Sequence, residues 1–519
     1  MKNIFFAFSM IILSGCPSKE EATENGPHID WYQGSMAQAL AEAKKNQKPL
    51  FVYWGAVWCP PCNLLKSTVF ADRVFIESTK RYIRVYLDGD TESAQQWGEK
   101  LKATGYPTLM ILNSSGEEVV RLSTVMAPQE LADMMDSAYD NLRPINETVA
   151  KVLEKKPGAI NTKEEWSYLA NYAWTQDVYY AEKKQKLSEI LESLESRVPI
   201  TYSKEKSRFY LNYLSAKVTE LGENKKLPKE IREKGVKRIN EILNDEELIK
   251  YNLEYLAYYC VELIKAIYPD MSPLRDAVIE RYRAALAAAR EKLPPGYERM
   301  ITFYPVIELG ELLSSSNMRS LSEKQRDEIK NEMVKITKLA KGEHTKIYTS
   351  NTSTYILSKA GFSDLAKSIL EEDLKQGIND YYTMSSLAWV EKEAGNKEKA
   401  LQWSEKAYGA AKGSATKIQW GSKYLTSLIE TLPKQKDRIF EELEGYYSHH
   451  LSAADSFLGR NKASLEKLAK QVKKWGLQEK FQPAIIDLKK KMLDGCNQEK
   501  EKKTKYYIKD CEKYFKKLI

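Results

Sequence analysis

The stretch Trp58-Cys59-Pro60-Pro61-Cys62 decides how the first part of the chain folds. A short apolar run at residues 49–54 precedes it, and a stretch predicted to be helical, Asn63 to Ala71, follows it. The predicted order is strand, tight turn and helix, which places Cys59 at a helix N-terminus. Free N–H groups and the helix dipole stabilise an anion there, and the thiolate is the form of cysteine that attacks disulfides.

The spacing of the two cysteines favours redox chemistry over two other interpretations. Two intervening residues let the thiol of Cys62 reach the sulfur of Cys59 and release a mixed disulfide. A structural zinc site would need a second CxxC or a histidine pair at ligand spacing, and the sequence contains neither. A purely structural disulfide gives no reason for a tryptophan before the turn. We therefore predict that Cys59 and Cys62 are catalytic.

Two motifs carry a resemblance to a known family. The first opens the domain and includes Ala39 to Lys45, Lys48-Pro49-Leu50, Val52 to Ala56 and Trp58 to Cys62, and the second is Gly105-Tyr106-Pro107-Thr108. Residues 29–142 thus resemble a thioredoxin-like domain of the periplasmic, often lipid-anchored group. The resemblance implies that Pro107 is cis and packs against the CxxC turn, that Tyr106 and Pro107 form a substrate-binding ledge, and that Trp58 shapes the turn.

The hydrophobic pattern agrees with an α/β sandwich in this domain. Helices are predicted over residues 36–47, 91–102 and 128–139, and strands over residues 82–87, 107–112 and 117–122. Alternating strands and helices pack in layers around one core. The predicted fold is an α/β thioredoxin-like sandwich followed by a large all-α, tetratricopeptide-like region.

Two positions depart from the thioredoxin pattern. Tyr53 stands where thioredoxin has a buried aspartate, and a phenol titrating near 10 is a poor base at neutral pH. Pro60 and Pro61 lack N–H groups, so stabilisation of a Cys59 thiolate falls to the amides of Cys62 and Asn63. Fewer donors raise the pKa of Cys59 and make the disulfide a weaker oxidant, which favours a reductase or isomerase that needs no cofactor.

The N-terminus is predicted to be a lipoprotein signal peptide, residues 1–16. A positive start and about ten apolar residues precede Leu13-Ser14-Gly15-Cys16, which resembles a lipobox. Cys16 is then the lipidation site that holds the chain on a lipid bilayer; an ordinary cleaved signal is the alternative. Residues 17–28 are predicted to be a flexible tether. Pro17 after the cysteine favours the outer over the inner membrane, on the periplasmic side.

From residue 143 onward the strand patterns vanish and helix-forming residues dominate. Residues 143–345 are predicted to be a helical region, and residues 346–519 a tetratricopeptide-like region ending in a helical hairpin. Ala360-Gly361 and Ala394-Gly395 lie one 34-residue period apart, and Ala366 and Ala400 repeat the interval. Ordinary antiparallel helices with coincident small residues are the alternative. Stacked helix pairs usually bind a partner.

The remaining cysteines and the histidines supply few candidates. Cys496 and Cys511 are predicted to form a structural disulfide in an oxidising compartment; a second redox relay is the alternative. Cys260 lies in an apolar helical stretch and is predicted to be a buried packing residue. The adjacent pair His449-His450 points in directions about 100° apart on a helix, so we predict no metal site.

The net charge of +8, from 80 basic and 72 acidic residues, is small for 519 residues and predicts no nucleic-acid partner. The sequence as a whole predicts a membrane-anchored thiol–disulfide oxidoreductase outside the cytoplasm. It would act on protein disulfides, with helices that recruit the partner and, for a reductase, a membrane-spanning electron relay. The alternative is a helical-repeat scaffold of a cell-envelope complex with an accessory redox domain. A third interpretation, a heme-maturation reductase, is supported only by the fact that CPPC turns are common in that group.

Overall fold

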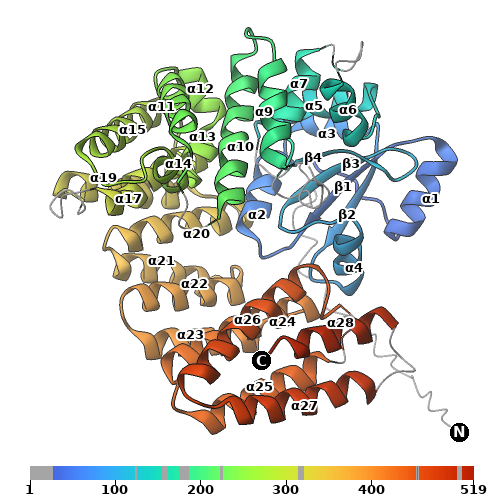
Figure 1. The fold of residues 1–519 in the computed structure, drawn as a ribbon, viewed down its shortest axis with the longest axis vertical. Helices are drawn as coiled ribbons and strands as arrows, with labels where there is room; N and C mark the ends of the chain where they lie inside the picture. The colour runs from blue at the N-terminus through green and yellow to red at the C-terminus, as the bar shows by residue number, and fades with distance from the viewer. Residues whose placement is uncertain are drawn as a thin grey trace, which may run out of the picture.

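A computed structural model describes residues 27–122, 126–154, 160, 162–174, 186–222, 226–313, 321–451, 453, 455–498 and 505–518. The predicted signal peptide, Cys16 and nearly all of the tether lie outside these residues. Figure 1 shows an α/β domain from which helices curve away and then return to it. No helix in the described ranges has the length and apolar character needed to cross a membrane.

The N-terminal domain is thioredoxin-like and is built on a four-stranded mixed sheet. Its strands are β1 (Leu50–Gly55), β2 (Ile83–Asp88), β3 (Thr108–Leu112) and β4 (Glu118–Leu122), in the order β2-β1-β3-β4. β1 runs parallel to β2 and antiparallel to β3, which is antiparallel to β4. Every residue of β1 is buried, because helices cover both faces of the sheet. That is why its sequence is an unbroken apolar run.

Five helices flank the sheet: α1 (Met36–Asn46), α2 (Pro60–Ser67), α3 (Arg73–Thr79), α4 (Glu92–Lys100) and α5 (Pro128–Asp140). The prediction of a helix from Asn63 to Ala71 is wrong at both ends. α2 begins at Pro60 because proline is well suited to the first helical position, where its missing N–H is not needed. Asp72 accepts hydrogen bonds from the amides of Val74 and Phe75 and so starts α3, which the sequence reasoning missed.

Within the described ranges, the chain after residue 143 forms helices and one isolated β-bridge. The helices are α6 (Ile145–Leu153), α7 (Lys163–Ala170), α9 (Leu187–Arg197), α10 (Ser203–Leu221), α11 (Lys229–Leu243), α12 (Glu246–Tyr251), α13 (Leu253–Tyr258), α14 (Cys260–Ile267), α15 (Pro273–Lys292), α16 (Tyr297–Ile301), α17 (Tyr304–Glu308), η2 (Leu309–Leu312), α19 (Glu323–Leu339), α20 (Glu343–Lys359), α21 (Ser363–Lys375), α22 (Asp380–Glu393), α23 (Lys397–Ala410), α24 (Ser414–Thr431), α25 (Lys436–His450), α26 (Gly459–Gln478), α27 (Gln482–Gln498) and α28 (Lys505–Lys516). The all-α prediction for this region is confirmed.

The 34-residue interval corresponds to two successive helix pairs, α20–α21 and α22–α23. Gly361 and Gly395 occupy the turns inside these pairs with φ of +88° and +84°, a left-handed conformation that glycine adopts at little cost. Ala366 and Ala400 are both buried where the second helix of each pair packs. The same interval in sequence therefore produces the same turn and the same close helix contact.

The helices contact the α/β domain at two separated places along the chain. Close to the domain, Tyr172 bridges to Leu122 of β4, and Trp166 and Phe209 belong to the same buried apolar cluster as Phe51 of β1. Farther along, α20 packs on α2, and α24 and α26 pack on α4 (Figure 1). The helical region thus forms an arc that packs against the α/β domain near its start and again from α20 to α26.

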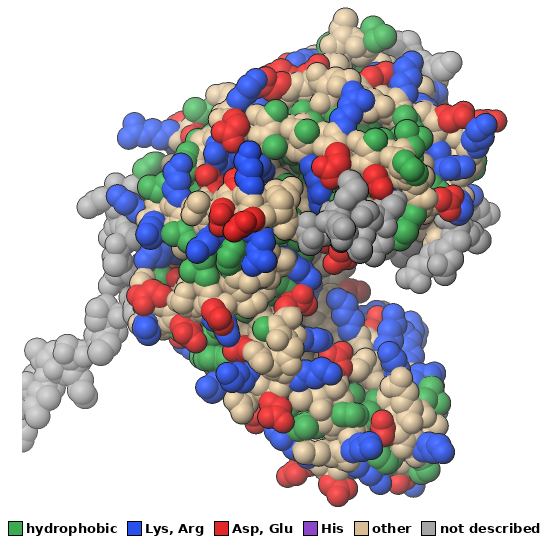
Figure 2. Space-filling view, turned by 90° about the vertical axis from the view of Figure 1, so that its left-hand side faces the viewer, with side chains coloured by type: hydrophobic (Ala, Val, Ile, Leu, Met, Phe, Trp, Pro, Cys, Tyr) green, Lys and Arg blue, Asp and Glu red, His purple; other side chains and the backbone are tan. Residues whose placement is uncertain are grey.

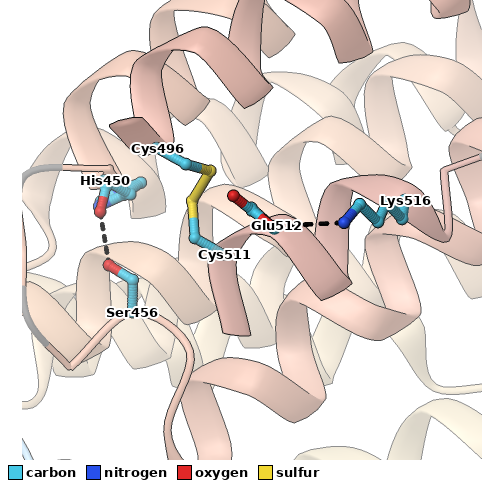
Figure 3. The surroundings of a disulfide bond; sticks show 6 residues. All are labelled: His450, Ser456, Cys496, Cys511, Glu512 and Lys516. Carbon is cyan, nitrogen blue, oxygen red and sulfur yellow. Dashed lines mark hydrogen bonds and ion pairs between the residues drawn. A yellow bond between two sulfur atoms is a disulfide. The ribbon is translucent and has the colours of Figure 1, made fainter. Parts of the chain in front are cut away.

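The two C-terminal cysteines join α27 to α28. Cys496 and Cys511 form a disulfide with a Cα–Cα distance of 6.0 Å, and both side chains are buried (Figure 3). Cys260 is a free thiol in the helical core, and burial raises its pKa to about 12. It therefore packs as an apolar residue and is unreactive.

Candidate active site

The turn between β1 and α2 places Cys59 as the N-cap of the helix. The N–H of Cys62 donates a hydrogen bond to Sγ of Cys59 over 3.4 Å. Pro60 and Pro61 fill the first two helical positions and offer no donor. The prediction that Asn63 also serves the sulfur is wrong, because its amide donates to the carbonyl oxygen of Cys59. One main-chain amide therefore stabilises the Cys59 sulfur.

Both active-site sulfurs are buried. Cys59 is 4% exposed and Cys62 is fully buried, although both are free thiols. Burial, with a hydrogen bond to Cys62, raises the pKa of Cys59 well above its usual value of 9, and the Arg460 guanidinium opposes this rise. The predicted direction of the Cys59 pKa shift is correct, but its main cause is burial and not the missing amides. Cys59 is thus held mainly as a thiol in this closed arrangement.

Tyr53 occupies the core beneath the turn. Burial first, and then the neighbouring Cys62, raises its pKa well above 10. Its hydroxyl has no conventional hydrogen-bond partner in the described part of the chain. A phenol in that state stays protonated at neutral pH, so it can place a proton beside the Cys62 sulfur but cannot remove one.

Tyr106 and Pro107 lie before β3, and the cis bond that the resemblance implies is present. The Tyr106–Pro107 peptide bond is cis, Pro107 is buried and Tyr106 is half-buried. The Tyr106 hydroxyl donates to the carbonyl oxygen of Gly89 over 3.1 Å and accepts from Nε2 of Gln95 over 2.7 Å. A Cβ atom at Gly89 would overlap the Tyr106 ring, so glycine is needed there to seat the ledge.

The helical arc covers Trp58 with polar contacts. The indole Nε1 of Trp58 donates to Oδ1 of Asp90 over 2.9 Å and to Oγ1 of Thr416 over 3.1 Å. Thr416 also donates to Asp90. Nδ2 of Asn379 donates to the carbonyl oxygen of Trp58 over 2.9 Å. Thr416 and Asn379 lie more than 300 residues from the turn, and nothing in the sequence identified them.

Aromatic rings and a guanidinium complete the cover. Trp58 meets Trp420 edge to face at 4.7 Å and stacks on Tyr382 at 5.9 Å between ring centroids. Arg460 lies over the Tyr106 ring at 4.4 Å and over Trp58 at 6.0 Å. Trp58 is consequently only 5% exposed. The Trp58 side of the turn is therefore covered by helices, whereas Val57 and Pro61 remain exposed.

A histidine contacts the first turn of α2. Nδ1 of His344 lies 2.6 Å from Oδ1 of Asn63, while Nδ2 of Asn63 donates to the carbonyl oxygens of Val57 and Cys59. His344 is exposed as a residue, but partial loss of water around its ring, with the nearby Lys66, lowers its pKa to about 4. The imidazole is neutral at pH 7 and must carry its proton on Nδ1 to donate to Asn63. Sequence reasoning assigned His344 no role.

A cavity of about 780 Å³ opens beside the covered turn. Trp58 forms part of its wall, and the rest comes mainly from α20, α22, α24 and α26. Within the described ranges, no group of three or more histidine, cysteine or acidic side chains is placed to hold a metal ion. The site therefore combines a thiol pair, a cis-proline ledge and an adjoining hollow lined by helices.

The comparisons with known proteins identify the first domain. Residues 30–114 match the family described as thioredoxin-like. A DsbH oxidoreductase structure is 19% identical and covers 25% of this chain and 96% of its own, with a TM-score of 0.21. A solution structure from Bacteroides thetaiotaomicron, described as a candidate disulphide-isomerase, is 28% identical and covers 23% of this chain and 98% of its own, also with a TM-score of 0.21. No curated protein matches the chain.

Proposed function

We propose that the protein is a thiol–disulfide oxidoreductase in which Cys59 attacks and Cys62 resolves. The observation that carries this proposal is the N-cap position of Cys59, which receives a hydrogen bond from the Cys62 amide beside the cis bond before Pro107. The Cys59 thiolate attacks one sulfur of a substrate disulfide, and the other sulfur leaves as a thiolate. Cys62 then attacks Cys59, which releases the second substrate thiol and leaves a Cys59–Cys62 disulfide.

Reduction or isomerisation of protein disulfides is the favoured direction. One amide serves the Cys59 sulfur, and burial raises the pKa of that thiol. A less stable thiolate makes the reduced form less favourable, and therefore makes the disulfide a weaker oxidant. As a reductase, the protein would need two electrons per cycle, which a membrane-spanning relay protein would supply to the Cys59–Cys62 disulfide.

We place this activity on the periplasmic side of a cell envelope, with Cys16 acylated and the outer membrane favoured over the inner. The support is the lipobox-like sequence before Cys16 and the following Pro17. The helical region, which would include tetratricopeptide-like repeats, would recruit the partner. A linked domain raises the local concentration of its substrate without any new chemistry.

A scaffold role for the helical arc is the second candidate. It is favoured by one observation: beneath the arc, Trp58 and Cys59 are only 5% and 4% exposed. An accessory domain in a rigid assembly can function with its cysteines covered, whereas an oxidoreductase that acts on many proteins needs an accessible sulfur. In that case the redox pair would be a minor part of the protein.

The reduction potential of the Cys59–Cys62 pair in the full chain separates these candidates. Equilibration with dithiothreitol buffers should show one reversible two-electron transition, closer to about −270 mV than to −120 mV. Cys62→Ser should trap a mixed disulfide on Cys59, and Cys59→Ser should trap none. The absence of any reversible transition would favour the scaffold, and a potential near about −120 mV would reverse the proposed direction.

A further inference from the structure

We propose that the hollow beside the redox turn binds an extended, acidic polypeptide segment next to the cysteine of the substrate. This inference rests on the oxidoreductase activity proposed above and names the substrate class. The segment would lie along the inner surface of the helical arc and bring its disulfide sulfur to Cys59.

The size and position of the hollow suit such a segment. Its volume of about 780 Å³ falls in the range of roughly 300–1,000 Å³ that is usual for ligand-binding cavities. Trp58, which directly precedes Cys59, lines the hollow together with Tyr382, on which its ring stacks at 5.9 Å. The hollow therefore reaches the residue next to Cys59, although Cys59 itself does not form part of the wall.

Three basic side chains of the hollow form no ion pair in the described part of the chain. Lys423, Arg460 and Lys467 contribute to its wall, and of these Arg460 is near enough to Asp90 for its charge to lower the pKa of that carboxyl. The buried Nε of Arg460 has no acceptor within the described ranges. Glu430 is the acidic residue of the wall, and it is paired with Lys392 over 2.6 Å. The net charge of the lining is positive.

The environment of Lys423 shows the electrostatic cost of this arrangement. Lys423 is exposed to solvent as a residue, and its ammonium group lies over the Trp420 ring at 4.1 Å. The protein that surrounds the ammonium group, with the charges of Arg460 and Lys467, lowers the pKa of Lys423 to about 8. An anionic ligand would relieve this mutual repulsion. The outer face in Figure 2 differs, because acidic and basic side chains are mixed there.

The rest of the lining suits a peptide. Half-buried hydroxyl and amide side chains of the wall that can pair with a main chain include Asn351, Ser386 and Ser464. Aromatic faces are supplied by Tyr355, Trp389 and Trp420. Main-chain groups of an extended segment need such partners because they lose water on binding. Few aliphatic side chains are present, so an apolar segment would gain little.

The cover explains why the segment must be extended. Cys59 is 4% exposed beneath the helices, so the surface of a folded protein cannot reach it without displacing them. An unfolded or terminal segment can enter the hollow. The choice of substrate then depends on the charge of the segment as well as on the presence of a disulfide.

Three disulfide-containing peptides that differ only in flanking residues test the proposal. One carries Asp and Glu, one Ser and one Lys, and each is reduced by the full chain with dithiothreitol as electron donor. We expect kcat/KM to be about tenfold higher for the acidic than for the basic peptide at low salt, and the difference to shrink at 0.5 M salt, which screens charge. Equal rates for the three peptides would overturn the proposal.

Two charge-reversal variants on α26, at Lys467 and Lys470, provide the matched control, and a neutral variant on α24 tests a second basic residue. Lys467→Glu should remove most of the preference for the acidic peptide, and Lys423→Gln should reduce it. Lys470→Glu changes an exposed residue of the same helix outside the lining and should leave the preference intact. Equal losses in Lys467→Glu and Lys470→Glu would contradict a specific site.

Two further measurements separate this inference from the function on which it rests. Oxidised glutathione is a small anionic disulfide. If the protein reduces oxidised glutathione in a charge-dependent way but reduces none of the three peptides, the assignment of a peptide ligand is overturned. A labelled acidic peptide with Ser in place of Cys measures binding without redox chemistry. Binding that depends on Lys467, with no reduction of any disulfide, would leave the acidic-segment site standing and refute the oxidoreductase.

Discussion

At the scale of single residues, Trp58 couples the redox turn to the helical arc. Its indole N–H is shared between Asp90 of the α/β domain and Thr416 of α24, and its carbonyl oxygen accepts from Asn379. Because Trp58 directly precedes Cys59, a movement of the helices would change the position and the burial of the Cys59 sulfur. Trp58 therefore connects the packing of the helices to the turn that carries the two cysteines.

Asp90 makes the stability of this contact depend on pH. Burial raises its pKa from 3.8 to about 6, so between pH 4 and 6 the folded state binds more protons than the unfolded state. Stability therefore falls as pH rises through this window, and the cost of the ionised carboxylate persists above it. Asp90→Asn keeps an oxygen acceptor and removes that charge.

We expect Asp90→Asn to stabilise the protein by about 1–2 kcal/mol at pH 7.5 and to have little effect below pH 4. Melting temperatures of the variant and the parent at the two pH values check this. Glu92→Gln, on the exposed first turn of α4, is the control and should change neither value. If Asp90→Asn stabilises the protein equally at both pH values, the raised pKa of Asp90 is not the cause of the stabilisation.

Arg460 is the second residue whose role belongs to this scale. Its guanidinium lowers the pKa of Cys59 without touching the sulfur in any contact described above, so it is a positioning residue. Arg460→Gln should slow alkylation of Cys59 by iodoacetamide several-fold at pH 7.5 and move the pH profile upward. Lys462→Gln, on the same helix, is the control and should leave the pH profile of alkylation unchanged. If Arg460→Gln also leaves that profile unchanged, the charge of Arg460 does not affect the pKa of Cys59.

At the scale of elements, the sequence predicted what local chemistry controls. Patterns a few residues long predicted the turn with its two cysteines and the strands β2, β3 and β4 to within one residue at each end. The disulfide between Cys496 and Cys511, which lie 15 residues apart, was predicted from an oxidising compartment and from the facing ends of a helical hairpin. The start of α2 was misplaced because Pro60 and Pro61 were read as turn residues, although proline is common at the first helical position. Periodicity says which face of α24 or α26 is polar, but not that Thr416 and Arg460 meet Trp58.

The hairpin of α27 and α28 allows a structural disulfide to be distinguished from a second redox relay. Cys496 and Cys511 close a loop of 15 residues, for which chain entropy predicts about 3 kcal/mol of stabilisation. The double variant Cys496→Ser, Cys511→Ser should lower the melting temperature and leave the potential of the Cys59–Cys62 pair unchanged. A relay would instead show slower turnover with an unchanged melting temperature.

At the scale of the whole molecule, the arc and the redox domain cannot be treated as separate parts. Trp166 and Phe209 share a buried cluster with Phe51 of the sheet, and Leu64 of α2 packs in another with Met300 and Tyr348. An isolated α/β domain would expose these surfaces. Variants of the full chain are therefore the correct means of testing what the helices do to the active site.

The cover itself can be tested by the size of reagent that reaches Cys59. In a Cys62→Ser background, iodoacetamide should modify Cys59 much faster than a maleimide attached to a large polymer, because Cys59 is only 4% exposed and helices pack on the adjacent Trp58. Adding Trp420→Ala should loosen the packing on Trp58 and raise the relative rate of the large reagent about tenfold. Trp475→Ala removes a buried tryptophan in contact with Phe440 and Phe481, so it controls for general destabilisation and should not change the ratio. If both reagents modify Cys59 of the Cys62→Ser protein at equal rates, the turn is open in solution. The helices could then recruit a partner protein but would not control access to Cys59.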